Sequence, residues 1–108
     1  MPVAGDLVAL LALADAVRLP MDEVTPESMR SGYSALASPG GAEMAEVVDR
    51  VIPGPDGGDL PIRSYRPPGA AERPPVIVYL HGGGWTIGDR ETHDERCRAL
   101  AAGTGAVV

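Results

Sequence analysis

Residues 76–88, VIVYLHGGGWTIG, combine a run of β-forming residues with three consecutive glycines. All five residues from 76 to 80 are apolar, which is typical of a parallel strand buried on both faces, although periodicity alone leaves a short buried helix open. Prolines stop directly before this run and glycines begin directly after it, which favours the strand. We therefore predict a buried parallel strand over 76–80 that ends in a turn without side chains.

A helix is predicted to follow the glycines. The tetrapeptide THDE at 92–95 has the pattern of a capping box, in which the Thr hydroxyl and the Glu carboxylate bond free N–H groups of the first turn. Gly103 is placed to end this helix, and residues 106–108 begin another β-like run. The inward stripe of the helix would be Cys97, Leu100 and Ala101. The order strand, glycine turn, helix, strand indicates a βαβ unit of a parallel sheet.

The first forty residues predict two helices. Asp6 can cap the first, which runs to about Val17. Its apolar stretch, LVALLALA, has the length of a signal-peptide core but no basic residue before it, so a packed helix is favoured over a secretion signal. The pair Thr25-Pro26 begins the second helix. One apolar stripe of this second helix recurs at i, i+4 and i+7: Met29, Tyr33 and Leu36.

Two strand-like segments follow, at 46–52 and 60–65, separated by the turn cluster PGPDGGD. This pattern predicts an antiparallel pair. The Pro-rich tract at 66–75 is interpreted as a connector, with a Pro-rich recognition ligand as the alternative.

Composition excludes several function classes for these 108 residues. Nine arginines against fifteen acidic residues give a net charge of −6, and no basic cluster occurs, so a nucleic-acid partner is not predicted. No run approaches the ~20 apolar residues of a membrane-spanning helix. Cys97 is the only cysteine, which fits a reducing compartment, and we expect a cytoplasmic protein. The absence of Lys, Asn, Gln and Phe beside abundant Ala, Gly, Pro and Arg suggests a bacterial source.

The glycines could serve a nucleotide site, a metal site or an anion site. Residues 83–88 have the glycine spacing of a phosphate-binding P-loop, but Asp89-Arg90 replace its lysine and hydroxyl. The dinucleotide fingerprint fails because Ile87 stands where its third glycine belongs. Both nucleotide interpretations are therefore disfavoured, and we expect no cofactor.

A metal site has little support. His93 and Cys97 have helical ligand spacing and His81 lies upstream, yet a third and a fourth ligand are missing, so a buried free cysteine near a histidine is favoured. The remaining chemistry is an oxyanion hole. Consecutive glycines let N–H groups converge on one negative oxygen, and each such donor is worth ~3 kcal/mol. A flexible turn with no task is the alternative.

The stretch YLHGGGWTIGDRETHDERCRALAAGTGAVV resembles the hormone-sensitive-lipase-like family of α/β-hydrolases, the bacterial esterase group with an HGGG motif. In that family two N-terminal helices form part of a cap, and an antiparallel strand pair and a buried strand ending in HGGGW follow. The resemblance implies the N-terminal part of an α/β-hydrolase fold, with cap helices in residues 1–42 and the start of the core in 43–108. It also implies that the fourth strand lies between the second and third.

The resemblance assigns roles to five residues. Gly83 and Gly84 would donate oxyanion N–H groups, and His81 would brace the turn instead of acting as the catalytic base. Trp85 would form a pocket wall, and Tyr33 with the cap stripe would face the acyl group of a small-molecule ester. For these last two positions, ordinary core packing is the alternative.

The family's nucleophile lies in a G-x-S-x-G elbow, followed by an acid and a histidine. None of these occurs in the 108 residues: the serines lack flanking glycines, and both histidines precede the family's base. We therefore expect the N-terminal third of a carboxylic-ester hydrolase whose triad lies beyond Val108. The alternative is a non-catalytic remnant or a binding relative, as in plant gibberellin receptors. The 108-residue chain alone is expected to be inactive, to hold no zinc and to be poorly soluble, because residues 76–80 would expose an apolar edge.

Overall fold

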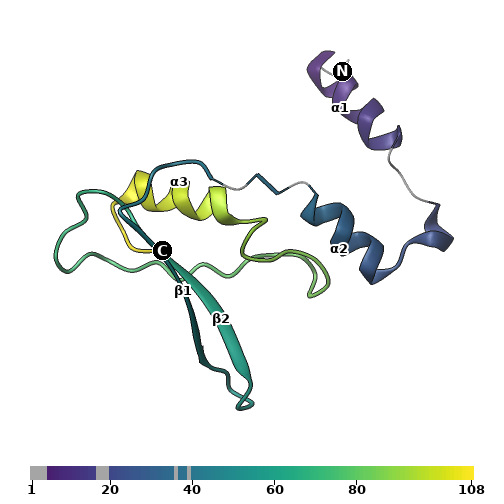
Figure 1. Cartoon of the computed structure of the whole chain (residues 1–108). Helices are drawn as coiled ribbons and strands as arrows, with labels where there is room; N and C mark the ends of the chain where they lie inside the picture. Colours follow the sequence, from purple (N-terminus) through teal and green to yellow (C-terminus); the bar gives the residue numbers. More distant parts are fainter. Residues whose placement is uncertain (1–4, 17–19, 36, 39) are drawn as a thin grey trace.

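The computed structural model describes residues 5–16, 20–35, 37–38 and 40–108. In chain order the elements are α1 (Gly5–Ala16), the short 3₁₀ helix η1 (Met21–Glu23), α2 (Pro26–Ser34), β1 (Glu46–Pro53), β2 (Asp59–Arg66) and α3 (Asp94–Thr104) (Figure 1). The radius of gyration is 17.6 Å. A compact chain of this length would have about 13 Å, so the elements form an open arrangement around a small core.

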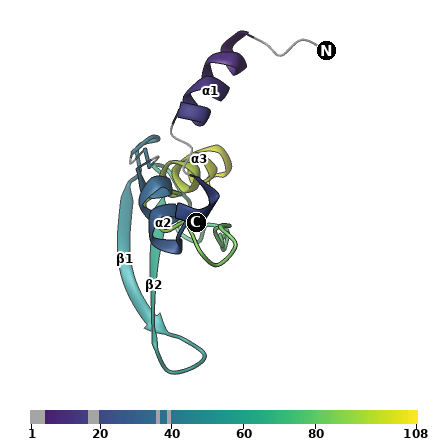
Figure 2. The same ribbon diagram turned by 90° about the vertical axis from the view of Figure 1, so that its right-hand side faces the viewer.

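Helix α1 confirms the first predicted helix, but its packing was predicted wrongly. Leu10, Leu11 and Leu13 are 51–63% exposed, and Figure 2 shows α1 projecting away from the other elements. Apolar residues occur on every side of this helix. It therefore has no single apolar face to place against a neighbour. No described helix is long and apolar enough to cross a membrane.

Helix α2 begins as predicted at Thr25-Pro26. The Thr25 hydroxyl accepts a hydrogen bond from the Ser28 N–H (3.1 Å), and the Ser28 hydroxyl accepts one from the Thr25 N–H (2.9 Å). This reciprocal cap satisfies two N–H groups that a helix start leaves unpaired. Val17 and Leu36, which end the first predicted helix and the predicted stripe, lie outside the described residues.

Strands β1 and β2 form the predicted antiparallel pair, in register from Glu46 opposite Arg66 to Pro53 opposite Asp59. Residues 54–58 connect them. Gly57 turns the chain with a φ of 81°, which glycine adopts without steric cost, and its N–H bonds the Gly54 carbonyl at 3.1 Å. The turn cluster therefore sets the hairpin as the sequence indicates.

Residues 76–80 do not form the predicted buried strand. Val76 makes one isolated parallel bridge, to Val107, and residues 77–80 have no regular secondary structure. Val78 and Leu80 are 80% and 85% exposed. Among the described residues only Val107 lies in position to pair with this segment. A strand needs hydrogen-bonded neighbours along its length. Beyond Ile77, which bonds Val107 and packs against the core, the segment stays unpaired, and Val78 and Leu80 stay exposed.

The last three residues lie between β2 and residues 75–77. Val108 exchanges two backbone hydrogen bonds with Tyr65, at 2.9 and 3.1 Å, which is the pattern of an antiparallel pair. Val107 donates to the Pro75 carbonyl at 2.9 Å and accepts from Ile77 at 2.8 Å, as a parallel bridge requires. This order across the sheet is the one that the family resemblance implies.

Helix α3 covers this junction and forms the small core. The core consists of Tyr65, Cys97, Ala101 and Val108, with Met44, Ile77 and Leu100 packed against it. The predicted inward stripe of α3 is thus confirmed. The predicted helix boundaries are wrong at both ends.

Helix α3 begins at Asp94 after His93, which provides no side-chain cap. Thr92, the expected cap, instead bonds Asp89 on the preceding turn: its N–H donates to the Asp89 carboxylate at 2.8 Å. At the other end the helix passes Gly103 and stops at Thr104. Gly105 follows with a φ of 71° and bonds the Ala101 carbonyl. A left-handed glycine directly after the last helical residue is the common helix stop.

Candidate active site: the glycine turn

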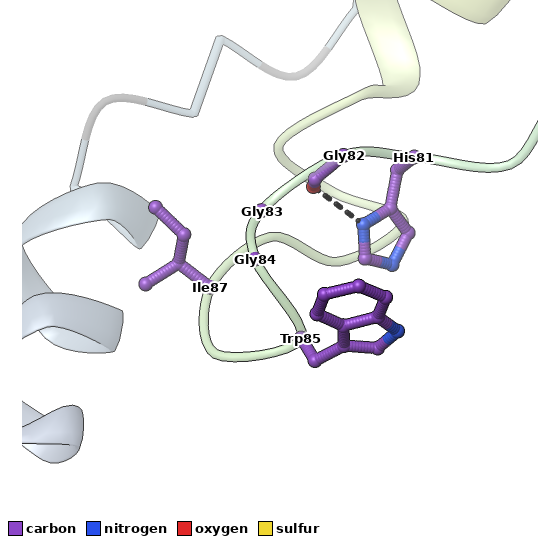
Figure 3. Close-up of a pocket in the computed structure, with 6 residues that line it drawn as sticks. All are labelled: His81, Gly82, Gly83, Gly84, Trp85 and Ile87. Carbon is purple, nitrogen blue, oxygen red and sulfur yellow. Dashed lines mark hydrogen bonds between the residues drawn. The ribbon is translucent and has the colours of Figure 1, made fainter.

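The glycine turn joins residues 76–80 to α3 and is bonded directly by Arg30 of α2. Its residues surround a hollow of ≈ 330 Å³ (Figure 3). The lining residues are His81, Gly82, Gly83, Gly84, Trp85 and Ile87. Four of the five site residues predicted from the sequence therefore lie together, and Tyr33 does not line the hollow.

The peptide unit between Gly82 and Gly83 is held by His81. The ring Nδ1 of His81 lies 2.9 Å from the Gly82 carbonyl oxygen (Figure 3). A carbonyl oxygen only accepts, so this contact requires the proton on Nδ1. Because a peptide unit is planar, fixing the carbonyl of Gly82 also fixes the direction of the Gly83 N–H.

The next peptide unit is held from the other side of the turn. The Gly83 carbonyl accepts hydrogen bonds from the N–H groups of Thr86 and Ile87, each at 3.0 Å. The same planarity then fixes the direction of the Gly84 N–H. The Thr86 hydroxyl also donates to the Gly84 carbonyl at 3.1 Å.

Among the residues that the structure describes, the N–H groups of Gly82, Gly83 and Gly84 donate no hydrogen bond. Gly83 has a φ of 143° and Gly84 a φ of 57°, so the chain turns sharply at these two positions. Successive N–H groups in such turns form concave sites for anions. The turn therefore offers oriented, unused donors at the hollow.

The two central glycines differ in the room around them. A β-carbon on Gly83 would overlap the carbonyl oxygen of Ile87, whereas one on Gly84 would meet no atom within 4 Å. Gly88, whose spacing suggested only a P-loop, is also confined. With a φ of 89°, its β-carbon would lie 2.8 Å from the Gly82 oxygen and 3.0 Å from His81 Nδ1. Gly88 thus lets the His81 contact form.

Trp85 has a left-handed backbone with a φ of 57°, a conformation that costs a non-glycine residue roughly 1–2 kcal/mol. Its indole is fully exposed at 104% and borders the hollow (Figure 3). A strained turn that presents a large apolar ring to solvent is more typical of a binding surface than of core packing.

Comparison with known proteins agrees with this geometry. A family profile described as the α/β-hydrolase fold matches residues 77–108. Over its whole length the chain is 35% identical to ethyl acetate hydrolase of Pseudomonas putida, covering 37% of that protein. A 62-residue match to the carboxylic ester hydrolase LipN of Mycobacterium tuberculosis has 50% identity and covers 57% of this chain and 16% of LipN.

Solved structures of ester hydrolases are also similar to this chain. An ester hydrolase from the metagenome of Lake Arreo superposes with a TM-score of 0.82 at 32% identity, covering 99% of this chain and 36% of that one. A thermostable esterase from Pseudomonas putida has a TM-score of 0.69 at 30% identity, covering 93% of this chain and 32% of that one. The chain belongs to the hormone-sensitive-lipase-like α/β-hydrolases. It spans about a third of the length of the ethyl acetate hydrolase and of the two solved esterases.

In this α/β-hydrolase segment, His93 lies directly behind the glycine turn. The side chain of His93 is buried, and its ring lies 5.2 Å from the ring of His81 and 6.0 Å from that of Tyr79. Tyr33 of α2 reaches the same place, with its ring 6.4 Å from His93. Tyr33 therefore contacts the support of the turn and not the hollow itself.

The carboxylate of Asp94, the next residue, joins α3 to β2 and to the segment before β1. It accepts hydrogen bonds from Tyr65 OH (2.8 Å), Arg98 Nε (2.6 Å), Arg63 (3.3 Å) and the Gly40 N–H (3.2 Å). Burial raises the pKa of Asp94, but the hydrogen bonds from Arg98, Tyr65 and Gly40 outweigh it, so the pKa lies below its usual value. Burial and the bond to Asp94 raise the pKa of Tyr65.

Arg63 extends this network toward the turn. Its guanidinium binds both Asp49 oxygens, at 2.7 and 2.9 Å, and Glu91 at 2.7 Å. The Arg63 side chain is only 13% exposed. The hydrogen bonds that it donates to Asp49 and Glu91 raise the pKa of Arg63, and the bond from Arg63 lowers the pKa of Asp49. The network therefore stays charged and connects β1, β2 and the start of α3.

The metal site and the phosphate site considered from the sequence have no supporting arrangement among the described residues. Within the described ranges no group of three His, Cys, Asp or Glu side chains could hold a metal ion. Cys97 is buried, and burial raises the pKa of its thiol. The Asp89 carboxylate stands directly after the turn, and the backbone hydrogen bond from Thr92 lowers its pKa. A permanent negative charge at this position opposes phosphate binding.

Sequence reasoning missed the residues that hold the turn from outside the motif. They are Arg30, Thr86, Ile87, Gly88 and His93. Gly88 carried a usable signal, since a glycine so close to a structured turn often marks a positive φ. Thr86 and Ile87 bond Gly83 three and four residues earlier, whereas Arg30 and His93 act through contacts that no local pattern reveals.

Proposed function

We propose that this chain supplies the oxyanion hole of a carboxylic-ester hydrolase, with the N–H groups of Gly83 and Gly84 as the donors. The observation that carries the proposal is the pair of planar peptide units whose carbonyls are fixed by hydrogen bonds while their N–H groups remain unused at the hollow. We call residues 81–88 the oxyanion turn. Its substrate is a small-molecule ester, and we expect a cytoplasmic protein with no nucleic-acid partner and no cofactor.

In ester hydrolysis by this class, a serine oxygen attacks the ester carbonyl and the carbonyl oxygen becomes negative. Donors that are already oriented stabilise this charge without reorganisation, at ~3 kcal/mol each. The alkoxide then leaves with a proton from the general acid, and water releases the acyl group. The nucleophile, the acid and the base lie outside these 108 residues.

His81 has a positioning role in this proposal. Its Nδ1 is engaged with the Gly82 carbonyl, and its ring lies against His93. A base must instead reach the nucleophile. Trp85 provides an apolar wall for the substrate at the edge of the hollow. Residues 1–42 would belong to the cap and 43–108 to the hydrolase core.

The sharpest test substitutes Gly84 by alanine in the protein expressed from the complete coding sequence. A methyl group there has room in the turn itself, and we expect it to occupy the space of the oxyanion. We expect kcat and kcat/KM to fall together by ~10²-fold with KM nearly unchanged, the pattern of an interaction made only in the transition state. Hydrolysis of a short-chain p-nitrophenyl ester provides the readout.

Gly69→Ala is the matched control, because Gly69 also has a left-handed φ, 72°, and a β-carbon there would also meet no atom within 4 Å. It should cost a similar backbone strain and leave kcat unchanged. Equal losses of kcat in both variants would show that Gly84 only shapes the turn and does not bind the oxyanion. Saturable ligand binding without turnover, and without labelling by a fluorophosphonate, would favour a binding protein of this fold.

A further inference from the structure

Helix α2 contacts the oxyanion turn through one long-range hydrogen bond. Arg30 Nε donates to the Thr86 carbonyl at 2.8 Å, across 56 residues of sequence. Figure 3 shows the side chain of Ile87, the next residue, directed toward α2. No carboxylate of the described residues forms an ion pair with Arg30, so this donor is available to the turn.

Thr86 links this bond to the proposed oxyanion donors. Its N–H bonds the Gly83 carbonyl at 3.0 Å, and its hydroxyl bonds the Gly84 carbonyl at 3.1 Å. The Gly83 carbonyl belongs to the peptide unit that carries the Gly84 N–H. A change in the position of the Thr86 carbonyl therefore changes the peptide unit that orients the Gly84 N–H.

A second route connects α2 to the other donor. Tyr33 lies three residues after Arg30, so the two side chains are neighbours on one face of the helix. The ring of Tyr33 lies 6.4 Å from that of His93, and His93 lies 5.2 Å from His81. His81 in turn holds the peptide unit that carries the Gly83 N–H. One face of α2 thus reaches both donors by separate contacts.

We propose that Arg30 is a positioning residue for hydrolysis: from α2 it holds the oxyanion turn in the geometry that receives the substrate's negative oxygen. This proposal rests on the proposed function. It makes α2 part of the catalytic machinery and not only a cover over the substrate. Because misplacing a catalytic group by about 1 Å can cost ~10²-fold in rate, releasing one of several restraints on the turn should cost roughly 10-fold.

The test compares Arg30→Met with Arg30→Lys in the protein expressed from the complete coding sequence. Methionine keeps an apolar stem and removes the donor, whereas lysine keeps a cationic donor. The matched control is Arg50→Met, since Arg50 is an exposed arginine on β1 whose side chain forms no ion pair with the described residues. We measure kcat, KM, melting temperature and inhibition by a trifluoromethyl ketone, which forms a tetrahedral adduct with an oxyanion.

We expect Arg30→Met to lower kcat about 10-fold with KM within about twofold and with an unchanged melting temperature, because Arg30 is exposed. Binding of the ketone should weaken by a similar factor. Arg30→Lys should restore part of both losses, and Arg50→Met should match the wild type.

A wild-type kcat in Arg30→Met, or a higher KM with kcat unchanged, would overturn the inference while the proposed function stands. A loss in kcat without weaker binding of the ketone would overturn it as well, because a displaced oxyanion turn must affect both. A wild-type protein without hydrolysis or fluorophosphonate labelling would overturn the proposed function, and this inference with it.

Discussion

The oxyanion turn and the ionic junction between β2 and α3 both contact the start of α3, and they are held together by different kinds of groups. The turn is held mainly through backbone carbonyls, and its central positions have no side chains. The junction, formed by Arg63, Tyr65, Asp94 and Arg98, is held by charged and polar side chains. Adjacent residues of one helix start serve both, since His93 supports the turn and Asp94 supports the junction.

Because the two regions are held by different groups, we expect the turn to determine turnover and the junction to determine stability. A site made of backbone donors is damaged by adding atoms, whereas a junction made of buried charges is damaged by removing them. Variants of the turn should therefore change turnover, and variants of the junction should change unfolding. Three predictions test this separation in the protein expressed from its complete coding sequence.

Asp94→Ala should have the largest effect. The side chain of Asp94 is 3% exposed and accepts bonds from Arg63, Tyr65 and Arg98. Removing one partner of a buried charged network costs up to ~3–5 kcal/mol. Here Arg63 keeps Asp49 and Glu91, and the loss comes from the buried Tyr65 hydroxyl and the Arg98 side chain, which lose their acceptor. Urea denaturation should show this loss in the free energy of unfolding. Asp94→Asn, which keeps an acceptor, should lose less.

For the folded fraction of Asp94→Ala, kcat should stay close to wild type if the two regions are independent. A kcat loss in the folded fraction as large as that of a turn variant would show that the junction also positions the turn. The separation between stability and turnover would then fail.

Gly83→Ala should exceed Gly84→Ala in its effect on the turn. A β-carbon on Gly83 would overlap the Ile87 carbonyl oxygen, so the turn that Thr86 and Ile87 close on the Gly83 carbonyl must shift. We expect a loss of ~10²-fold or more in kcat/KM for Gly83→Ala, with a lower melting temperature than Gly84→Ala. Measuring both variants by steady-state kinetics and thermal unfolding gives the comparison. Equal melting temperatures would show that the turn around Gly83 is looser than this geometry requires.

The pH dependence of stability should be the smallest effect. The pKa of Asp94 is lowered in the folded state. Its contribution is therefore present above the unfolded pKa of about 4 and is lost as the pH falls through the lower folded pKa. Melting temperatures measured from neutral to acidic pH should drop below about pH 4. The drop should be shallower in Asp94→Asn, and equal slopes would assign it to other carboxylates.

Two segments with similar strand patterns show where sequence reasoning succeeded and failed. Residues 46–52 and 60–65 form a regular hairpin, because the turn at 54–58 brings each strand to its partner. Residues 76–80 have a stronger apolar pattern, yet only Val76 pairs, with Val107. A strand pattern indicates that a segment can be extended, but pairing requires a neighbour that the local sequence does not contain.

The start of α3 shows a different limit of sequence patterns. The pattern THDE predicted a capping box, but Thr92 bonds Asp89 of the preceding turn, and the helix begins at Asp94. A threonine hydroxyl has more than one acceptor and donor within reach. The competing contact comes from Asp89, three residues earlier and directly after the oxyanion turn, so two local patterns compete for the same threonine.

The sequence by itself determined the hairpin, the start of α2 at Thr25, the inward stripe of α3 and the place of a turn without side chains at 82–84. Each of these depends on residues close together in the chain. Only the tertiary structure decided that Val108 pairs with Tyr65, that Asp94 collects bonds from β2 and that Arg30 reaches Thr86. These contacts join residues at least 29 positions apart, and a hydrogen bond depends on distance and angle in space, which no local spacing of residue types encodes.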